Sequence, residues 1–487
     1  MAQQETNIKL RRFTKIVCTL GPSSKTVDQI QQLVDAGMNV ARINLSHGTR
    51  EGHADVIRSL KAINAHSAST GGPCIAILLD TKGAEVRTGD VAAPIVVHAG
   101  EEVFFSYEPG SSADRKIIRV DHPGFADDAK RAECILLDNG EISFDLIEVH
   151  ADGLVAARAR ESGSIGSRRH VNLPGARLTL PSFTDKDWQD IAFAVEQNVD
   201  FLALSFIREA GDVVLVRDFL AKKNSGIKII SKIETPEAVQ NMRDILAVSD
   251  GIMIARGDLG AEMPFEKVPV IQDELVALCK DAGKPVIVAT HMLESMIHSP
   301  MPTRAEVTDI AHAATTRTDA TMLSGETASG LYPLAAVNAM DRVLRETELH
   351  IMRSFKMEKR QVASEREARA EAAVSLALST NAAALIVMTR SGRTALDVCA
   401  FRPSIPILAF TNSEFVQHSL LLSFGILPLI VAFDADPEAT VRGALSAAVR
   451  LGLLRKGNRV VLVSDTKAHE LVVNTIQMRD VVQEKEE

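Results

Sequence analysis

Two neighbouring segments of the chain end abruptly in charged residues that are suited to chemistry. Residues 228–234 read KIISKIE, and residues 252–260 read IMIARGDLG. Side chains alternate along a strand, so Lys232 and Glu234 point to the same side. Asp258 follows the end of the second segment. Two carboxylates and a lysine that meet at one edge would suit a hard divalent cation beside a transferring phosphoryl group.

A simpler explanation is a structural ion pair between Lys232 and Glu234 or Asp258. For a single pair this explanation is the better one, because burying any of these charges without a partner costs several kcal/mol. It weakens only if other strands of the chain end in the same way.

The elements that must position these residues alternate regularly. Candidate strands lie at 15–20, 40–45, 74–80, 201–206, 227–233, 251–255, 285–290 and 320–323. Helical segments lie near 24–36, 50–66, 185–197, 209–223, 235–246, 269–282, 303–316 and 333–348. Strands that are apolar on both faces and alternate with helices indicate a parallel sheet. Eight such units predict an α/β fold with a closed (β/α)8 TIM barrel, and a doubly wound open sheet is the alternative.

A long interval separates the third and fourth strands. Residues 84–181 within it have short alternating strands, and Asn139-Gly140 is a hairpin signal because it supplies a positive φ. We expect an inserted small β-barrel domain here, which would act as a lid over the site. The expected division is an N-terminal arm at 1–12, the barrel at 13–83 and 182–348, the β lid at 84–181, and a C-terminal α/β domain at 349–487.

Composition excludes several classes of function. Of the 487 residues, 46% are hydrophobic and 24% are charged, which is typical of soluble globular proteins. The formal net charge of -9 gives no basic surface for nucleic acid. No apolar run is long enough to span a membrane, and the N-terminal residues do not form a secretory signal. The five scattered cysteines indicate free thiols, so a cytoplasmic location is expected.

Polar residues follow nearly every candidate barrel strand at the same end. They are Arg42, Asn44, Ser46 and His47 on the second strand, Asp80, Thr81 and Lys82 on the third, Lys232 and Glu234 on the fifth, Arg256, Gly257 and Asp258 on the sixth, Thr290 and His291 on the seventh, and Ser324 and Glu326 on the eighth. Independent ion pairs would not be distributed in this way. The set therefore indicates an active site at the C-terminal ends of the strands.

Residue types suggest how this site would work. Glu234 and Asp258 offer hard oxygen ligands for Mg²⁺ or Mn²⁺. Arg42 offers a planar fork for a phosphate or carboxylate, and Lys232 can balance the charge of a transferring phosphoryl group. Gly257 allows a ligand to approach the backbone.

A second group contains only oxygen donors. Asn44, Ser46, Asp80 and Thr81 carry one negative charge between them. This composition suits a large monovalent cation better than zinc.

These segments also resemble a known family. The strings are TKIVCTLGPSS (14–24), MNVARINLSHG (38–48), LLDTKGAEVRTG (78–89), GSRRHVNLPGA (166–176), IKIISKIE (227–234), DGIMIARGDLG (250–260), GKPVIVATHMLESM (283–296), PTRAEVTD (302–309) and MLSGETASGLYP (322–333). In this order they resemble pyruvate kinase from about residue 13 to about residue 410. The resemblance implies a (β/α)8 barrel with an inserted β domain and a C-terminal α/β domain.

The resemblance implies a role for each matched residue. Arg42 would contact the phosphate of phosphoenolpyruvate, Lys232 would stabilise the transition state, and Thr290 would bind the substrate carboxylate and help to protonate the enolate, with the proton passing through water. The remaining implied ligands are Glu234 and Asp258 for Mg²⁺, Gly257 and Asp258 for the substrate, Asn44, Ser46, Asp80 and Thr81 for K⁺, and Asn44, Leu45, Ser46, His47, Arg87 and Arg169 for the nucleotide. The implied reaction is phosphoryl transfer from phosphoenolpyruvate to ADP, and the implied assembly is a homotetramer.

Some residues differ from the family pattern. Ala84 stands where the family commonly has proline, Arg169 replaces a lysine, Asn139 replaces an aspartate, and His291 replaces a residue that is usually glutamine. Glu85 is retained, as in the members that depend on K⁺, so strong activation by K⁺ is expected.

The C-terminal domain carries a candidate effector site. Thr389, Ser391, Gly392, Arg393 and Thr394 resemble the family's allosteric phosphate loop, and an ordinary strand-to-helix turn with a good N-cap is the alternative. Residues 464–470, SDTKAHE, replace the glycine-rich effector loop near the end. Control by a sugar phosphate would then be altered or lost.

Two other functions compete with a kinase. A divalent-metal lyase or aldolase acting on pyruvate enolate would use Glu234, Asp258 and Arg42, but would not need Lys232, a K⁺ cluster or a lid. The second competing function is that of a binding protein built on a degenerate barrel that has lost catalysis. The intact set of polar residues at the strand ends argues against this function.

Overall fold

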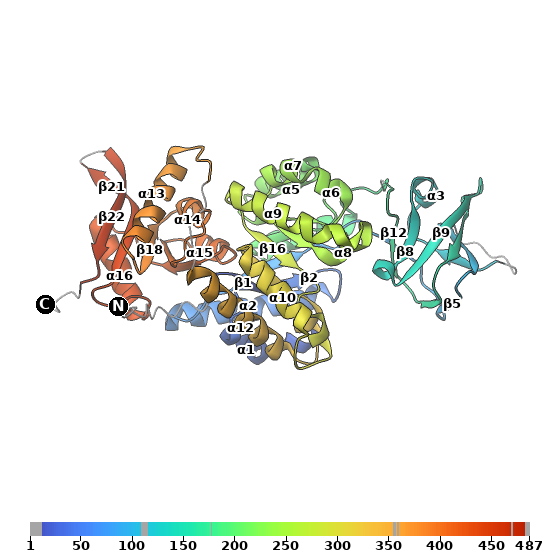
Figure 1. Cartoon of the computed structure of the whole chain (residues 1–487), viewed down its shortest axis with the longest axis horizontal. Coiled ribbons are helices and arrows are strands. Elements are labelled where there is room, and N and C mark those ends of the chain that lie inside the picture. The colour runs from blue at the N-terminus through green and yellow to red at the C-terminus, as the bar shows by residue number, and fades with distance from the viewer. Residues whose placement is uncertain are drawn as a thin grey trace.

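The computed structural model describes residues 12–108, 115–176, 178–353, 357, 360–468 and 471–482. Nearly all of the expected N-terminal arm, 1–12, therefore lies outside the described residues. Three units follow one another along the long axis of the molecule, with the inserted lid at one end, the barrel in the middle and the C-terminal domain at the other end (Figure 1). Within the described ranges, no helix is both long and apolar enough to cross a membrane.

The central unit is a closed barrel of eight parallel strands in the order β1-β17-β16-β15-β14-β13-β3-β2. The strands are β1 (Lys15–Thr19), β2 (Val40–Asn44), β3 (Ala76–Asp80), β13 (Phe201–Leu204), β14 (Lys228–Ile233), β15 (Gly251–Ala255), β16 (Val286–Ala289) and β17 (Ala320–Leu323). The predicted (β/α)8 barrel is confirmed, and the open-sheet alternative is wrong.

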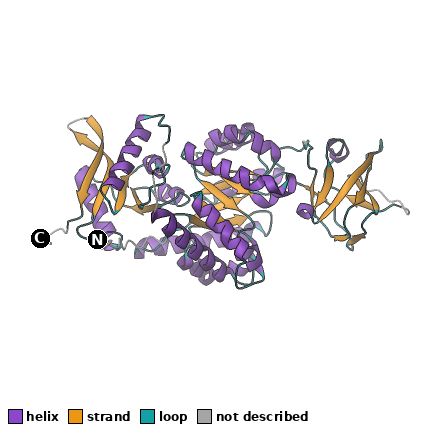
Figure 2. Cartoon of the chain, in the orientation of Figure 1, coloured by secondary structure: helices purple, strands orange, loops and turns teal. Residues whose placement is uncertain are grey.

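Helices cover the outside of the barrel (Figure 2). They are α1 (Val27–Ala36), α2 (Arg50–Thr70), α4 (Asp185–Glu196), α5 (Ala210–Lys222), α6 (Pro236–Gln240), α7 (Met242–Val248), α9 (Val268–Ala282), α10 (Arg304–Thr315) and α12 (Pro333–Arg353). The side chains of Thr26, Thr184 and Thr303 each cap the start of a helix and form a capping box with a residue three positions on. Alternate residues of each strand, such as Phe201, Ile230 and Met253, fill the barrel interior, while their neighbours pack under the helices.

The lid is a curled seven-stranded sheet in the order β4-β12-β8-β9-β10-β6-β7. Its strands are β4 (Val86–Arg87), β6 (Glu102–Ser106), β7 (Ile117–Arg119), β8 (Cys134–Leu137), β9 (Ile142–Val149), β10 (Val155–Ala159) and β12 (His170–Asn172); β5 (Ile95–Val97) pairs separately with β11 (Gly163–Ile165), and α3 (Phe125–Ala129) packs beside them. A single bridge between Thr88 and Val120 joins the two edges of the sheet. The sheet therefore closes on itself around a separate apolar core.

The predicted hairpin lies between β8 and β9, but its turn differs in detail from the expectation. Leu137 pairs with Ile142, and a turn of 3-10 helix at Asp138–Gly140 joins the strands. Positive φ values occur at Asp138 (48°) and Gly140 (96°). Asp138 thus adopts the left-handed conformation together with the glycine, and aspartate tolerates it better than most residues do.

The C-terminal domain is a five-stranded sheet in the order β20-β19-β18-β21-β22. Its elements are α13 (Glu365–Ser379), β18 (Ala384–Met388), α14 (Arg393–Cys399), β19 (Ile407–Thr411), α15 (Glu414–Leu420), β20 (Ile426–Ile430), α16 (Pro437–Arg450), β21 (Arg459–Ala468) and β22 (Leu471–Asp480). The first four strands are parallel, and β22 pairs antiparallel with β21.

The C-terminal domain packs against the end of the barrel opposite the lid. Arg402 donates to both carboxylate oxygens of Asp319, which precedes β17, at 2.5 and 2.7 Å. His418 pairs with Asp200, which precedes β13, at 3.0 Å. Because both carboxylates precede strands, this domain covers the N-terminal ends of the barrel strands. The C-terminal ends remain available to the lid, which is inserted after β3.

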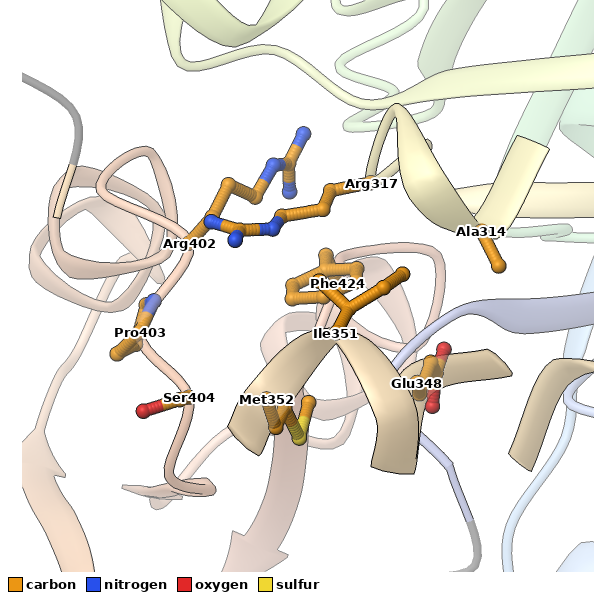
Figure 3. Close-up of a pocket in the computed structure, with 9 residues that line it drawn as sticks. All are labelled: Ala314, Arg317, Glu348, Ile351, Met352, Arg402, Pro403, Ser404 and Phe424. Carbon is orange, nitrogen blue, oxygen red and sulfur yellow. The ribbon is translucent and has the colours of Figure 1, made fainter. Parts of the chain in front are cut away.

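A small pocket lies in the same interface (Figure 3). Its lining residues are Ala314, Arg317, Glu348, Ile351, Met352, Arg402, Pro403, Ser404 and Phe424. Its volume of about 10 Å³ can hold a single water at most, so it is not a substrate site.

Candidate active site

The charged residues at the ends of β3 and β14 meet in one buried cluster. Nζ of Lys232 lies 2.8 Å from Oε1 of Glu234 and 3.3 Å from Oδ1 of Asp80. All three side chains are buried, and neither carboxylate is more than 1% exposed. The two residues predicted to face the same side of the fifth strand, Lys232 and Glu234, are therefore in direct contact.

Arg42 joins this cluster from β2. Its Nε donates to Oδ2 of Asp80 at 2.7 Å, and its Nη1 donates to the hydroxyl of Thr19, the last residue of β1, at 2.9 Å. Thr19 in turn donates to the carbonyl of Leu323 at the end of β17. These bonds fix the plane of the Arg42 guanidinium at the rim.

Burial and neighbouring charges oppose each other in the cluster. Burial alone would lower the pKa of Lys232, but Asp80, Glu234 and Asp258 outweigh it and raise that pKa above its usual range. Burial raises the pKa of Glu234 to about 7 against the attraction of Lys232, and the negative charge of Asp258 adds to the rise. Burial would also raise the pKa of Asp80, yet Lys232 and Arg42 lower it. Lys232 therefore remains a charged ammonium shared by several carboxylates.

Ser205 also belongs to the cluster, although it is not among the residues predicted from the strand ends. Its hydroxyl accepts a hydrogen bond from Nζ of Lys232 at 2.8 Å and donates to the carbonyl of Thr81 at 2.7 Å. The signal was present in the sequence, because Ser205 continues the alternation of Phe201 and Ala203, whose side chains fill the barrel interior. The backbone N–H of the next residue, Phe206, donates to Oε2 of Glu234 at 2.7 Å.

Asp258 and Gly257 lie in α8 (Arg256–Glu262), which begins directly after β15. The N–H of Gly257 donates to Oγ1 of Thr290 at 2.7 Å, so the ends of β15 and β16 are joined here. Asp258 is close enough to the Lys232 cluster to influence the pKa of both Lys232 and Glu234. The predicted substrate-carboxylate residues and the predicted metal residues thus share one end of the barrel.

The carboxylates fit a hard divalent cation. Within the described residues, Oε1 of Glu234 is buried and accepts no well-directed hydrogen bond, and the Lys232 ammonium lies 2.8 Å from it. Among the described residues, no three His, Cys, Asp or Glu side chains gather as a complete metal cage. Mg²⁺ commonly binds one or two carboxylates and takes its other ligands from substrate oxygens and water, so a pair such as Glu234 and Asp258 would suffice.

The oxygen-only group forms a neighbouring part of the rim. Oδ1 of Asn44 accepts the N–H of Ser46 at 3.0 Å, and Oγ1 of Thr81 accepts the N–H of Ser205 at 3.2 Å. Asp80 belongs to both groups because it also contacts Arg42 and Lys232. Amide, hydroxyl, carbonyl and carboxylate oxygens of this kind fit a large monovalent cation.

The remaining candidate nucleotide residues lie at two places. Leu45 has a buried side chain, so only its backbone could contact a ligand, whereas His47 is exposed. In the lid, Nε of Arg87 bonds Glu85 at 2.6 Å, and Arg169 pairs with Asp138 at 2.9 Å. The lid arginines therefore pair within the lid and are not brought into contact with the Lys232 cluster.

The lid is tied to the barrel beside the site. Nδ2 of Asn172 in β12 donates to Oε1 of Glu262 at the end of α8 at 2.5 Å. Burial raises the pKa of Glu262 to about 7. The ring of His170, which precedes Val171 in β12, lies 6.0 Å from the ring of Phe206.

The candidate effector loop lies between β18 and α14. Gly392 has a φ of 82°, and its N–H donates to the hydroxyl of Thr389 at 2.9 Å. Thr389 is buried, and its hydroxyl already accepts this hydrogen bond within the turn. A phosphate site at Thr389, Ser391, Gly392, Arg393 and Thr394 remains a prediction. In the replaced loop, His469 and Glu470 lie outside the described residues.

The fold and the rim together define a class of protein: a barrel enzyme with a charged site suited to phosphoryl transfer, at the end of the barrel that carries the inserted β domain. Comparison with known proteins agrees. Residues 11–337 match the family model "Pyruvate kinase, barrel domain", and residues 367–478 match "Pyruvate kinase, alpha/beta domain". The chain belongs to the pyruvate kinase family. It is accordingly a phosphotransferase, and the reaction of the family is phosphoryl transfer from phosphoenolpyruvate to ADP.

Similar proteins come from distant organisms. The chain is 42% identical to plastidial pyruvate kinase 2 of Arabidopsis thaliana over 93% of this chain and 78% of that protein. It is 42% identical to a pyruvate kinase of Dictyostelium discoideum over 93% of this chain and 90% of that protein. It is 39% identical to a pyruvate kinase of Geobacillus stearothermophilus over 95% and 79%, respectively. The barrel unit and the C-terminal unit each have a counterpart in the family.

Proposed function

We propose that the Lys232 cluster is where this chain transfers the phosphoryl group of phosphoenolpyruvate to ADP, giving pyruvate and ATP. The observation that carries the proposal is the buried ammonium of Lys232, held by Glu234, Asp80 and Ser205 within 3.3 Å at the end of the barrel that faces the lid. An ammonium at this position can balance the charge on the oxygens of a transferring phosphoryl group. A lyase acting on pyruvate enolate would have no use for it.

The other residues would position the substrate. Arg42, oriented by Asp80 and Thr19, would hold the phosphate of phosphoenolpyruvate. Gly257, Asp258 and Thr290 would hold its carboxylate side. After transfer, the enolate of pyruvate takes a proton at its terminal carbon. Because a threonine hydroxyl is a weak acid, Thr290 would deliver this proton through water.

Glu234 and Asp258 would hold Mg²⁺ or Mn²⁺, and Asn44, Ser46, Asp80 and Thr81 would hold K⁺. When bound, these cations would neutralise phosphate and enolate oxygens. The partly compensated carboxylate of Glu234 supports the divalent site, since a cation would offset the cost of its burial.

The nucleotide would lie between rim and lid. Asn44, Leu45, Ser46 and His47 would contact its phosphates from the barrel, and Arg87 and Arg169 from the lid. Reaching the nucleotide would require the lid arginines to exchange their present partners, Glu85 and Asp138, for phosphate oxygens. Lid closure is thus part of the proposal.

Pyruvate formation from phosphoenolpyruvate, measured with and without ADP and with and without K⁺, tests the proposal. We expect pyruvate only when ADP is present, with equal amounts of ATP, and strong activation by K⁺. Pyruvate without ADP would indicate a lyase or phosphatase instead. Full activity in buffer free of K⁺ and Na⁺ would contradict the monovalent site.

The proposed assembly, compartment and regulation of this chain follow those of the family. We propose a homotetramer in the cytoplasm, acting in glycolysis, with the loop at 389–394 as a phosphate-responsive allosteric site. Sedimentation of the purified chain would test the assembly, and activity titrated with sugar phosphates would test the effector loop.

A further inference from the structure

Arg256 connects three elements at the edge of the site. It is the first residue of α8, and its guanidinium reaches the end of the neighbouring strand β16. Nη2 donates to the carbonyl of Thr290 at 2.7 Å, and Nε approaches the same carbonyl at 3.2 Å. Nη1 donates to Oδ1 of Asp309 on α10 at 2.7 Å. The arginine therefore grips the backbone of Thr290 from one side and is anchored on the other.

The backbone that it grips is strained. Thr290 has a φ of 65°, and His291 has a φ of 56°. For a β-branched residue this conformation is an outlier, and each such residue costs on the order of 1–3 kcal/mol. Such a conformation persists only where its surroundings enforce it. The paired donors of Arg256 to the carbonyl of Thr290 are one such constraint.

The strain sets the position of the Thr290 hydroxyl. Oγ1 of Thr290 accepts the N–H of Gly257 at 2.7 Å and donates to the carbonyl of Ala289 at 2.6 Å. A substrate carboxylate that bound both Gly257 and Thr290 would have to replace the bond between them. The hydroxyl can turn toward such a carboxylate without moving the backbone, because Arg256 holds the carbonyl of Thr290 and not its side chain.

We propose that Arg256 is a positioning residue that holds Thr290 in its left-handed conformation, so that the hydroxyl faces Gly257 and the reacting end of the substrate. The inference rests on the role proposed above for Thr290. The alternative is a plain structural ion pair between Arg256, whose side chain is 11% exposed, and Asp309, which is 30% exposed; such a pair would contribute to stability alone. Arg256 would then matter little to the reaction.

A double-mutant cycle separates these explanations. The variants are Arg256→Met, Thr290→Ala and the two combined, assayed for pyruvate formation. Proton exchange at the methyl group of pyruvate, followed by NMR in D₂O, reports on the carbon protonation step. Displacement of a group by about 1 Å can cost about 100-fold in rate. We expect R256M to lower kcat by roughly 10- to 100-fold, with methyl exchange falling in parallel and the KM for ADP changing less than about threefold.

Arg217→Met is the matched control. Arg217 also donates to a backbone carbonyl, that of Val248, at 2.7 Å and to a carboxylate, Asp250, at 2.9 Å. It makes these bonds before β15 begins, at the opposite end of the strand from the site. We expect R217M to keep kcat within about twofold of wild type, since exposed and half-exposed pairs contribute little.

The cycle has a distinct result for each failure. If Arg256 acts through Thr290, the double variant will be no slower than T290A alone. Fully additive losses, or a kcat of R256M equal to that of R217M, would overturn the inference while leaving the role of Thr290 intact. Wild-type kcat and methyl exchange in T290A would instead contradict the role proposed for Thr290, and the inference with it.

A milder pair of variants covers the case in which R256M does not fold. Arg256→Lys keeps the charge but loses the planar fork whose separate nitrogens donate to Thr290 and Asp309, and Asp309→Asn weakens the anchor without altering the arginine. We expect both to lower kcat by less than R256M, and neither to lower it further in the T290A background. Additive losses in that background would again overturn the inference.

Discussion

Replacing Ser205 with alanine is the sharpest test of how the lysine is held. The hydroxyl of Ser205 accepts a hydrogen bond from the Lys232 ammonium at 2.8 Å and donates to the Thr81 carbonyl at 2.7 Å. A hydrogen bond to a charged group contributes about 1.5–3 kcal/mol. In S205A the ammonium keeps its ion pair with Glu234 at 2.8 Å and its longer contact with Asp80 at 3.3 Å, so it stays charged but is less constrained.

The effect on rate follows from that energy. If the whole contribution is lost from the transition state, kcat falls by roughly 10- to 150-fold, at 1.36 kcal/mol for each factor of ten. The assay is steady-state pyruvate formation at saturating phosphoenolpyruvate and ADP, with the urea midpoint measured on the same preparation. We expect the KM for phosphoenolpyruvate to change little, because Arg42 is untouched.

Ser231→Ala provides the control for burial. Ser231 is fully buried on the adjacent strand β14, and its hydroxyl bonds that of Ser249 at 2.7 Å, away from the cluster. The two variants should lose similar stability, yet only S205A should lose activity. Equal kcat values in S205A and S231A would refute the reasoning that Ser205 positions Lys232.

Three further predictions concern stability. Burial would lower the pKa of His418, but its pairing with Asp200 raises that pKa above 6.5. This interdomain pair therefore stabilises the fold by an amount on the order of 1 kcal/mol below pH 6.5, and that stabilisation is lost as pH rises through the raised pKa. The free energy of unfolding of H418Q in urea, measured across pH, should lack this pH-dependent contribution. Arg402→Met leaves the carboxylate of Asp319 buried without its guanidinium partner, so the free energy of unfolding should fall by about 3–5 kcal/mol. A fall below about 1 kcal/mol would argue against the importance of this ion pair. Burial raises the pKa of Glu262 from 4.5 to about 7. The contribution of Glu262 to stability is therefore fully present below pH 4.5 and is lost as pH rises to about 7. E262Q should flatten the pH profile of Tm between pH 4.5 and 7, and an unchanged profile would contradict the shift.

Much of the barrel could be predicted because its strands are apolar on both faces and end in polar residues. The side chain alternation that placed Lys232 and Glu234 together holds in the structure, as their 2.8 Å contact confirms. Parallel strands bring their C-terminal ends to one rim, so residues distant in sequence, such as Arg42 and Asp80, could be expected to meet there. The domain boundaries and the role of each site residue remain predictions.

Other features could not be predicted, because they depend on three-dimensional contacts. Nothing local in the sequence shows that Thr290 and His291 adopt positive φ, since neither is glycine and the carbonyl of Thr290 is held by Arg256 at the start of α8. Ser205 is an ordinary serine until the lysine is placed against it. The turn at Asp138–Gly140 likewise depends on the pairing of Leu137 with Ile142, which no dipeptide signal specifies.

The most direct test of the central claim is the rate of phosphoryl transfer in Lys232→Met, which removes the ammonium and keeps an unbranched apolar side chain. Cationic groups that stabilise the transferring phosphoryl group contribute roughly 10³- to 10⁵-fold to kcat. The account predicts that K232M, shown to be folded by circular dichroism, forms pyruvate and ATP from phosphoenolpyruvate and ADP at least 1,000-fold more slowly than wild type, on the order of the loss of such a cation. A folded K232M with a kcat within tenfold of wild type would contradict it.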